Sequence, residues 1–279
     1  MKAVVNNIIK FSNVDGPGNR TAVFFQGCNY KCLYCHNPET INRCNNCGDC
    51  VVECPVGALA MENSIVKWNK KKCIDCDQCI KICKFYSSPK VEEYTVEGLV
   101  KEIEKLRIFI QGVTVSGGEA TLNIKFITEF FKEVKKMNLS TFVDTNGSID
   151  LSLDKYTEFL EVSDKFMLDI KAWNESEHRE LTNADNKIVL KNLEFLLKKN
   201  KMFEVRTVVN SMINAKETVL NVAKVLKDYK NVRYKIIAYR PFGVKEELKD
   251  KLLPLPKNEE LEELKKIVEK TGDIEVILL

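Results

Sequence analysis

Short apolar segments alternate with longer amphipathic segments along most of the chain. The short segments are rich in Val, Ile and Phe, which is typical of buried strands, whereas the longer ones repeat their apolar residues every three or four positions, as helices do. The predicted strands cover residues 20–27, 112–118, 140–147, 165–171, 203–210 and 232–240. One predicted helix begins near Thr95, one carries Ile124, Ile127, Phe131 and Val134 on one stripe, and others cover about 153–161, 187–199, 215–227 and 258–270.

This alternation of strands and helices predicts the fold class. Parallel strands need crossover connections, which are usually helices, so the pattern favours an α/β fold in which helices cover a parallel sheet. Six repeats are too few for a closed eight-stranded barrel, and we therefore predict a partial (β/α)6 TIM-like barrel. Residues 38–90 show little helical patterning and predict a small inserted domain, which leaves residues 1–37 and 91–279 for the barrel.

Composition and charge exclude several classes of protein. The 279 residues include 43 Lys and Arg against 40 Asp and Glu, a net charge of +3, which argues against a nucleic-acid-binding surface. The N-terminal stretch MKAVVNNIIKF is interrupted by Asn6, Asn7 and Lys10, so it lacks the continuous apolar region of a signal peptide. No apolar run reaches the length of a membrane span. We expect a cytoplasmic protein with neither a membrane nor a nucleic acid as partner.

The cysteines are the most specific feature of the sequence. All eleven lie between positions 28 and 83, and disulfides are not expected because the cytosol keeps thiols reduced. Two runs of cysteines, each with two, two and three intervening residues, have the spacing of bacterial ferredoxins, whereas a zinc ribbon would use two separated pairs. The runs therefore predict two cubane 4Fe–4S clusters. They consist of Cys44, Cys47, Cys50 and Cys54, followed by Pro55, and of Cys73, Cys76, Cys79 and Cys83.

The wiring of these clusters follows from the same comparison. In ferredoxins the fourth cysteine of each run binds the other cluster. The predicted ligand sets are Cys44, Cys47 and Cys50 with Cys83, and Cys73, Cys76 and Cys79 with Cys54. The three other cysteines lie in GCNYKCLYCHNP (27–38) and would leave one iron of a third cubane without a protein ligand, open to a small molecule. They are Cys28, Cys32 and Cys35.

Polar motifs recur where the predicted strands end. SGGE (116–119), DTNG (144–147) and DIK (169–171) end three successive strands, and YRPFG (239–243) ends the last one. The carboxyl ends of parallel barrel strands lie on one face, which is where such folds carry their active sites. We expect these motifs to surround one site, together with the first cysteine motif and Arg206.

Together these motifs resemble those of a known superfamily. A C-x3-C-x2-C motif after the first strand, followed by GGE, resembles the radical S-adenosylmethionine (radical SAM) superfamily. VDGPGNRTAVFFQGC and CHNP (within 14–38), DTNG and MLDIK resemble, more narrowly, the glycyl-radical enzyme activating enzymes. The form with a ferredoxin-like double-cluster insert is similar to the YjjW type. The resemblance extends from about residue 8 to residue 243.

The resemblance implies roles for the motif residues. SAM would complete the open cluster through its amino and carboxylate groups, with Glu119 near the ammonium and Lys171 near the carboxylate. Glycine at 117 and 118 would let the backbone approach closely, and Tyr34 would contact the adenine. The implied SAM contacts are Tyr34, Cys35, His36, Gly117, Gly118, Glu119, Asp144, Thr145, Asp169, Ile170, Lys171, Arg206 and Arg240.

Two further sites are implied, and the sequence departs from the family at two positions. Asp15 matches a contact for the substrate backbone. Ala120 follows GGE where relatives commonly carry proline, and Arg240 stands where several relatives have a SAM-contacting histidine, although arginine does not titrate near neutral pH. The residues that match the surroundings of a monovalent cation in a relative are Asp144, Thr145, Met167 and Asp169.

The implied activity is the activation of a partner glycyl-radical enzyme. A low-potential donor such as flavodoxin or ferredoxin would reduce the open cluster, SAM would be cleaved to a 5′-deoxyadenosyl radical, and that radical would take a hydrogen atom from a glycine. The cofactors do this chemistry, so no side chain is expected to act as a general base. Two alternatives stay open, namely a radical SAM enzyme acting on a small molecule or nucleic acid, and a ferredoxin-type electron carrier. His178 is expected on a helix surface.

Overall fold

The framework of the protein is a nine-stranded sheet. The computed structural model describes the whole chain, residues 1–279. The strand order is β11-β10-β9-β8-β7-β6-β2-β1-β5, and from β2 to β11 every neighbouring pair is parallel. Both pairs that involve β1 are antiparallel. The strands are β1 Lys2–Ser12, β2 Arg20–Phe25, β5 Glu92–Thr95, β6 Gly112–Gly117, β7 Ser140–Thr145, β8 Lys165–Asp169, β9 Met202–Val209, β10 Arg233–Ala238 and β11 Val276–Leu278.

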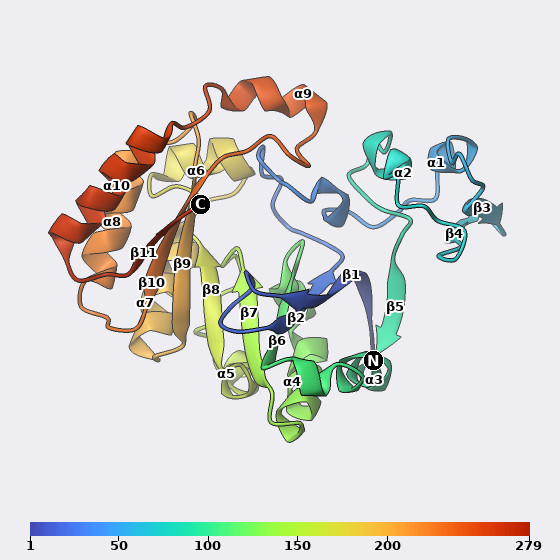
Figure 1. Cartoon of the computed structure of the whole chain (residues 1–279), viewed down its shortest axis with the longest axis horizontal. Coiled ribbons are helices and arrows are strands. Elements are labelled where there is room, and N and C mark those ends of the chain that lie inside the picture. Colours follow the sequence, from blue (N-terminus) through green and yellow to red (C-terminus); the bar gives the residue numbers. More distant parts are fainter.

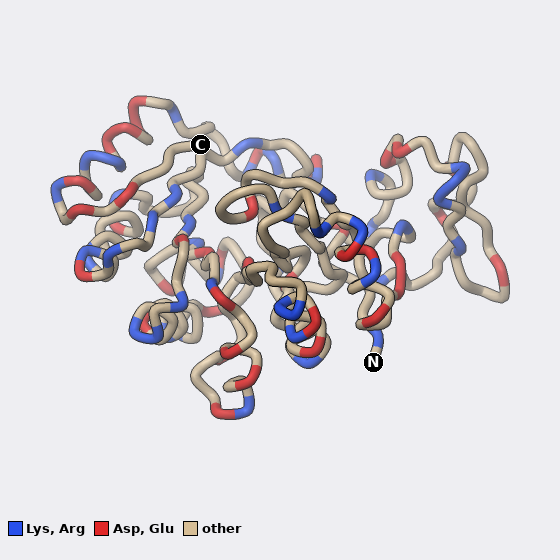
Figure 2. The backbone as a smooth tube through the Cα atoms, turned by 60° about the horizontal axis from the view of Figure 1, so that its bottom comes forward, with Lys and Arg blue, Asp and Glu red and all other residues tan.

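The helices follow the strands in chain order (Figure 1). Neighbouring helices pack against each other, α3 on α4, α4 on α5 and α8 on α10. The main helices are α3 Val96–Glu104, α4 Ile124–Lys136, α5 Thr157–Val162, α6 Glu175–Thr182, α7 Lys187–Lys198, α8 Ala215–Leu226 and α10 Asn258–Thr271, with a short α9 Glu246–Lys249. Figure 2 shows acidic and basic residues interspersed along them. None of the helices combines the length and the apolar character needed to cross a membrane.

Local sequence accounts for where these helices begin and which side they bury. The Thr95 side chain accepts a hydrogen bond from the backbone N–H of Gly98 at 3.1 Å, so it caps α3 where the sequence predicted its start. The predicted apolar stripe of α4 is buried, and the charged residues between its members stay toward solvent. All four residues of the stripe, Ile124, Ile127, Phe131 and Val134, belong to the main hydrophobic core.

The six predicted strands are confirmed as β2 and β6–β10, but the sheet is wider than predicted. Strands β1, β5 and β11 were not predicted. In β1 the apolar alternation is interrupted by Asn6 and Asn7, and the sheet pairing is irregular at that point, with a register shift between Val5 and Asn7. β11 has only three residues and no helix after it. These strands carry too little apolar periodicity to be recognised without their neighbours.

The cysteine-rich segment between β2 and β5 forms the small lobe at the right of Figure 1. Its elements are short and surround a small apolar cluster of Cys50, Leu59 and Val66. Backbone hydrogen bonds within the segment run from Cys28 N–H to the Ile41 carbonyl and from Asn42 N–H to the Tyr86 carbonyl, both 2.9 Å. Its elements are a 3₁₀ turn Pro38–Thr40, α1 Asp49–Val52, the antiparallel hairpin β3 Leu59–Glu62 and β4 Ile65–Trp68, and α2 Gln78–Lys81.

Candidate functional site

A cavity of about 320 Å³ opens at the carboxyl ends of the parallel strands. The segments that follow β2, β6, β7 and β8 surround it, and side chains from β9 and β10 form part of its wall. Most residues that the sequence singled out therefore meet at one place. Those that line it are Asp15, Cys28, Cys32, Tyr34, Cys35, His36, Gly117, Gly118, Glu119, Asp144, Thr145, Asp169, Lys171 and Arg206.

Three of the expected residues do not line this cavity. Ile170 and Met167 are fully buried, and Ile170 lies between two cavity residues of β8 and its extension, so strand alternation directs its side chain to the opposite face. The side chain of Arg240 is exposed, and it is the backbone carbonyl of Arg240 that lies 2.9 Å from His36 Nε2. A direct SAM contact by the Arg240 side chain stays a prediction.

The loop of the first cysteine motif is held from both sides. Lys31 N–H and Leu33 N–H donate to the carbonyls of Thr182 and Leu181, at 3.0 and 2.9 Å, so the loop rests against the end of α6. Backbone N–H of Tyr30 lies 3.4 Å from the sulfur of Cys28. Hydrogen bonds of this kind stabilise thiolate ligands of iron–sulfur clusters.

Burial disfavours the charged thiolate form of these three cysteines unless a cation lies beside them. It raises the pKa of Cys28 and of Cys35 to about 12 and also raises the pKa of Cys32. No three Cys, His, Asp or Glu side chains converge to hold a single metal ion. A cubane is wider than one ion and takes one thiolate at each ligated corner. The donor set, three partly buried thiols beside a polar cavity, therefore fits a cluster rather than a mononuclear metal.

The GGE turn packs tightly on the cysteine loop. Gly118 N–H donates to Phe25 O at 3.0 Å and Glu119 N–H to Gly27 O at 2.8 Å. A β-carbon on Gly118 would lie 2.3 Å from the carbonyl oxygen of Gly27, and Gly117 has a φ of +118°. Only glycine satisfies both demands, the close approach and the left-handed backbone.

Hydrogen bonds hold the Glu119 carboxylate in place, but its two oxygens do not accept the same number of them. One oxygen accepts from the hydroxyls of Thr121 and Thr145 and from Thr121 N–H, whereas the other accepts only the 2.7 Å bond from Asn146 N–H. Burial raises the pKa of Glu119, and these donors oppose that shift. A buried carboxylate with one oxygen still able to accept is suited to bind a cation such as an ammonium group.

Two ion pairs also line the cavity. Lys171 Nζ lies 3.0 Å from Asp169 and 5.4 Å from the centre of the Tyr34 ring. Burial alone would lower the pKa of Lys171, but Asp169 and Tyr34 hold it well above its usual value. Burial also raises the pKa of Asp144 to about 6, although Arg206, whose Nη1 lies 3.0 Å from it, opposes the shift. The site thus combines buried charges of both signs.

Some functional neighbours were not singled out from the sequence. Ser116 donates to Asp144 at 3.0 Å, and Asn146 Nδ2 lies 3.9 Å from the sulfur of Cys28. Both lie inside the quoted motifs SGGE and DTNG, but neither residue was given a role of its own. The prediction for His178 was wrong, because this residue is fully buried, its ring packs edge-on against Tyr30 and its Nδ1 lies 2.8 Å from Ala184 O.

One cysteine of the small lobe lies among those of the other run. Cys54 lines one cavity together with Cys73, Cys76 and Cys79. Burial would raise the pKa of Cys54, but backbone N–H groups after it, including that of Ala58 at 3.2 Å from the sulfur, lower it. Burial and the neighbouring Cys44, Cys79 and Cys47 raise the pKa of Cys50 to about 11. Cys83 contacts the hydroxyl of Ser87 at 3.4 Å.

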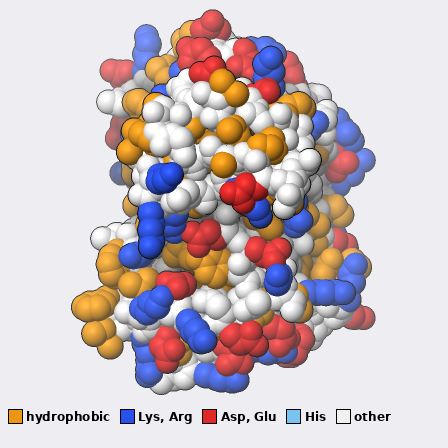
Figure 3. Space-filling view, turned by 90° about the vertical axis from the view of Figure 1, so that its right-hand side faces the viewer, with side chains coloured by type: hydrophobic (Ala, Val, Ile, Leu, Met, Phe, Trp, Pro, Cys, Tyr) orange, Lys and Arg blue, Asp and Glu red, His pale blue; other side chains and the backbone are white.

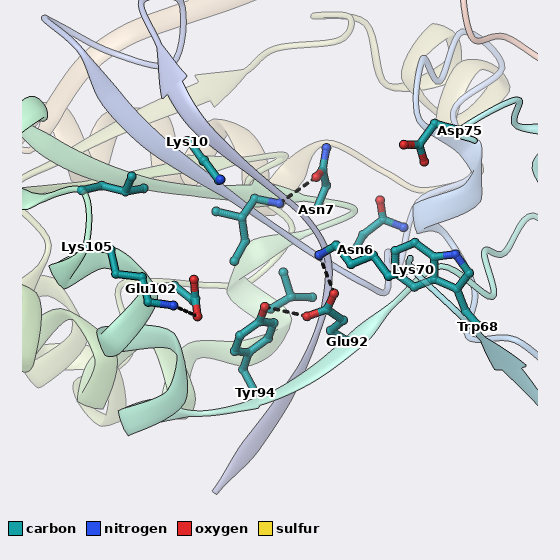
Figure 4. Close-up of a pocket in the computed structure, with 13 residues that line it drawn as sticks. Asn6, Asn7, Lys10, Trp68, Lys70, Asp75, Glu92, Tyr94, Glu102 and Lys105 are labelled. Atoms are coloured by element: carbon teal, nitrogen blue, oxygen red, sulfur yellow. Dashed lines mark hydrogen bonds and ion pairs between the residues drawn. The ribbon is translucent and has the colours of Figure 1, made fainter. Parts of the chain in front are cut away.

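A second cleft of about 310 Å³ lies where the small lobe meets the core (Figure 4). Lys70 from the lobe pairs with Glu92 of β5 at 2.6 Å, and the other oxygen of Glu92 accepts from the hydroxyl of Tyr94 at 2.7 Å. Lys90 pairs with Asp77 at 2.6 Å on the same side. Figure 3 looks onto this end of the molecule and shows it hollowed between its upper and lower parts. The Lys70–Glu92 pair is a contact between the lobe and the core.

Comparison with known proteins gives a consistent result. The family model described as the radical SAM superfamily matches residues 22–229. The chain is 31% identical to the trans-4-hydroxy-L-proline dehydratase activating enzyme of Clostridioides difficile, over 96% of this chain and 97% of that protein. It is 30% identical to pyruvate formate-lyase 1-activating enzyme of Escherichia coli, over 97% of this chain and 98% of that protein.

Solved structures share the fold at much lower sequence identity. QueE from Escherichia coli matches with a TM-score of 0.57 at 12% identity, covering 100% of this chain and 94% of that one. SuiB of Streptococcus suis, solved with its precursor peptide SuiA, matches with a TM-score of 0.59 at 11% identity, covering 90% of this chain and 46% of that one. At this identity the likeness concerns the fold alone.

Proposed function

This chain belongs to the radical SAM superfamily and, within it, to the glycyl-radical enzyme activating enzymes, and on that premise we propose how its cavity serves the reaction. It activates a glycyl-radical enzyme by radical SAM chemistry and uses a 4Fe–4S cluster and SAM. What we propose are the residues that hold these groups, the content of the small lobe and the interaction partners.

Cys28, Cys32 and Cys35 are proposed to hold the SAM-binding cluster. When bound, the cluster and SAM supply a 5′-deoxyadenosyl radical that takes a hydrogen atom from a glycine of the partner. The chain's own residues bind and orient these groups and prevent side reactions. The observation that carries this proposal is the convergence of the three thiols, GGE, DTNG and DIK on one cavity.

The cavity carries an acidic and a basic side chain that suit the two ends of an amino acid. The incompletely satisfied oxygen of Glu119 would accept the ammonium group of SAM, and the Lys171 ammonium, raised in pKa and still charged, would meet its carboxylate. Tyr34, buried beside Lys171, offers a ring face to the adenine. Asp15 lines the same cavity and is a proposed contact for the glycine-bearing segment of the partner.

Anaerobic cleavage of SAM tests this assignment. Reconstituted protein with a strong reductant should convert SAM to methionine and 5′-deoxyadenosine, measured by chromatography. Absence of cleavage by protein that carries its full iron content would contradict the assignment of the cavity as the SAM site.

We propose that the small lobe is a ferredoxin-like domain that binds two further 4Fe–4S clusters, for three in all. The ligand sets would be crossed, with Cys54 completing the set of the second run and Cys83 that of the first. The shared cavity of Cys54 with Cys73, Cys76 and Cys79 supports the first exchange. Pro55 supports it as well, because it fixes the backbone directly after Cys54 and restricts how that thiol can turn back to its own run.

Single substitutions should reveal the crossed wiring. Cys54→Ala should perturb the same cluster signal as Cys73→Ala, and Cys83→Ala the same signal as Cys44→Ala, because each pair would serve one cluster. Electron spin resonance of the reduced lobe clusters measures this, in a background that lacks Cys28, Cys32 and Cys35. If Cys54→Ala matched Cys44→Ala instead, each run would bind its own cluster and the ferredoxin wiring would be wrong.

The partners follow from the reaction. The substrate is a glycyl-radical enzyme, as the names of the relatives indicate for those proteins. The proposed electron source is a low-potential donor such as flavodoxin or ferredoxin. Membership of the YjjW type, inferred from the double-cluster insert, remains a proposal that three clusters per chain would support.

A further inference from the structure

The segment that follows β10 packs against the first cysteine motif. His36 comes directly after Cys35, and its Nε2 lies 2.9 Å from the carbonyl oxygen of Arg240. Gly243 approaches the same residue closely, because a β-carbon at this position would lie 2.1 Å from the His36 carbonyl oxygen. This part of the segment therefore lies beside the cysteines that would hold the SAM-binding cluster.

Lys245 extends the same segment to the small lobe. Its Nζ donates to the carbonyl of Cys83 at 2.9 Å and to that of Ile80 at 3.1 Å. It also lies 5.3 Å from the centre of the Tyr86 ring. Within Cys83, only the carbonyl carbon, Cα and Cβ separate this oxygen from the sulfur. The Lys245 ammonium group is thus placed beside a residue whose thiolate would ligate a lobe cluster.

The charge of Lys245 is not cancelled by an ion pair. Its hydrogen-bond acceptors are two neutral carbonyls, and the side chain is only partly buried. Glu247, two residues further on, accepts from the hydroxyl of Tyr86 at 3.2 Å. Glu39 faces the same region, and burial raises its pKa while Lys245 opposes that shift. Neither carboxylate bonds to Lys245, so its positive charge acts on its surroundings.

Lys90, a second lysine near the lobe cysteines, has the opposite arrangement. It pairs with Asp77 at 2.6 Å and with Asp75 at 3.3 Å, and both of these carboxylates lie between cysteines of the second run. Two negative charges offset its own. Lys245 therefore differs from Lys90 in bringing an unpaired positive charge to the lobe.

A cavity of about 230 Å³ shows on which side of the lobe this charge lies. Lys245 and Tyr86 line it together with Cys32 and Cys35 of the first motif. The lobe cluster that Cys83 ligates would accordingly be on the side of the SAM-binding cluster, with Lys245 close to both.

We propose that Lys245 raises the reduction potential of the lobe cluster that Cys83 ligates, so that this cluster is easier to reduce than it would be without the lysine. The inference rests on the proposed two-cluster lobe. Reduction transfers one electron from the low-potential donor to the cluster, which becomes more negative by one charge, and no proton or bond is transferred. A nearby positive charge stabilises the more negative state.

Redox titration of the lobe clusters tests the proposal. Electron spin resonance follows it in the background that lacks Cys28, Cys32 and Cys35, where only the lobe clusters contribute. Lys245→Met removes the charge and keeps a long side chain. The signal that Cys83→Ala perturbs should become roughly tenfold harder to reduce, which corresponds to about 59 mV for one electron. The other lobe signal should change by less than about twofold, because a more distant charge is screened.

Two further variants separate charge from packing. Lys245→Arg keeps the positive charge, so its titration should stay close to that of the wild type. Lys249→Met is the matched control, since Lys249 ends α9 and pairs with Glu246 of the same short helix instead of contacting the lobe. Its lobe signals should both titrate as in the wild type.

Three results would overturn the proposal. They are unchanged potentials in Lys245→Met, an equal shift of both lobe signals, and a loss of lobe iron in Lys245→Met, which would leave Lys245 a structural role only. Iron content is therefore measured before each titration, and about eight irons per chain are expected in this background. Wild-type protein that shows no lobe signals at all would instead contradict the proposed two-cluster lobe.

Discussion

Replacing Cys28, Cys32 and Cys35 together with alanine should abolish SAM cleavage and lower the iron content from about twelve to about eight per chain. The loss of activity is complete because only this set leaves an iron open to SAM, whereas the clusters of the small lobe would be fully ligated by protein. Iron analysis after anaerobic reconstitution, together with the yield of 5′-deoxyadenosine, measures both effects.

A matched triple variant in the lobe separates the two kinds of cluster. Cys73, Cys76 and Cys79 replaced together by alanine should also lose about four irons but keep SAM binding, because these residues lie outside the SAM cavity. Wild-type protein that saturates at about four irons would mean that the lobe binds no clusters, and the ferredoxin-like assignment would be wrong.

Lys171→Ala should weaken SAM binding by roughly 1.5–3 kcal/mol, or about ten- to hundredfold. The side chain is only 9% exposed, so its charge is poorly screened by water. Its removal would also leave Asp169 without its 3.0 Å partner, and an unpaired carboxylate there would repel the carboxylate of SAM. Equilibrium dialysis with labelled SAM measures the change.

The control for the Lys171 variant is a lysine of β8, the strand that ends two residues before Lys171. Lys165, at the other end of β8, bonds the carbonyl of Asn200 at 2.9 Å, away from the cavity. Lys165→Ala should leave SAM affinity unchanged within about twofold. Equal affinity in the Lys171→Ala and wild-type proteins would remove Lys171 from the SAM site.

The main strands and the site motifs could be predicted because their signals are local. Buried parallel strands read as apolar runs, and residues at their carboxyl ends meet at one face whatever the details of the sheet. The cavity is therefore lined, as predicted, by Gly117, Gly118, Glu119, Asp144 and Lys171. The spacing of the cysteines predicts their grouping into clusters, and this grouping stays a prediction.

Features that depend on partners distant in sequence could not be predicted. His178 sits in the polar helix α6, and only its packing against Tyr30 of the cysteine loop makes it buried. Likewise, β11 is a strand because β10 lies beside it. The pairing of Arg206 with Asp144 joins residues from β9 and β7, whose alignment depends on the sheet register. The spacing of residues along the sequence does not reveal these contacts.

The most direct test of the account is the formation of a glycyl radical. The reconstituted protein is incubated without oxygen with SAM, a low-potential reductant and the glycyl-radical enzyme encoded nearest to it, and the mixture is examined by electron spin resonance. We predict the doublet of a glycyl radical on the partner, absent when Cys28, Cys32 and Cys35 are replaced. SAM cleaved to 5′-deoxyadenosine at full rate, with no radical on that glycyl-radical enzyme, would contradict the account.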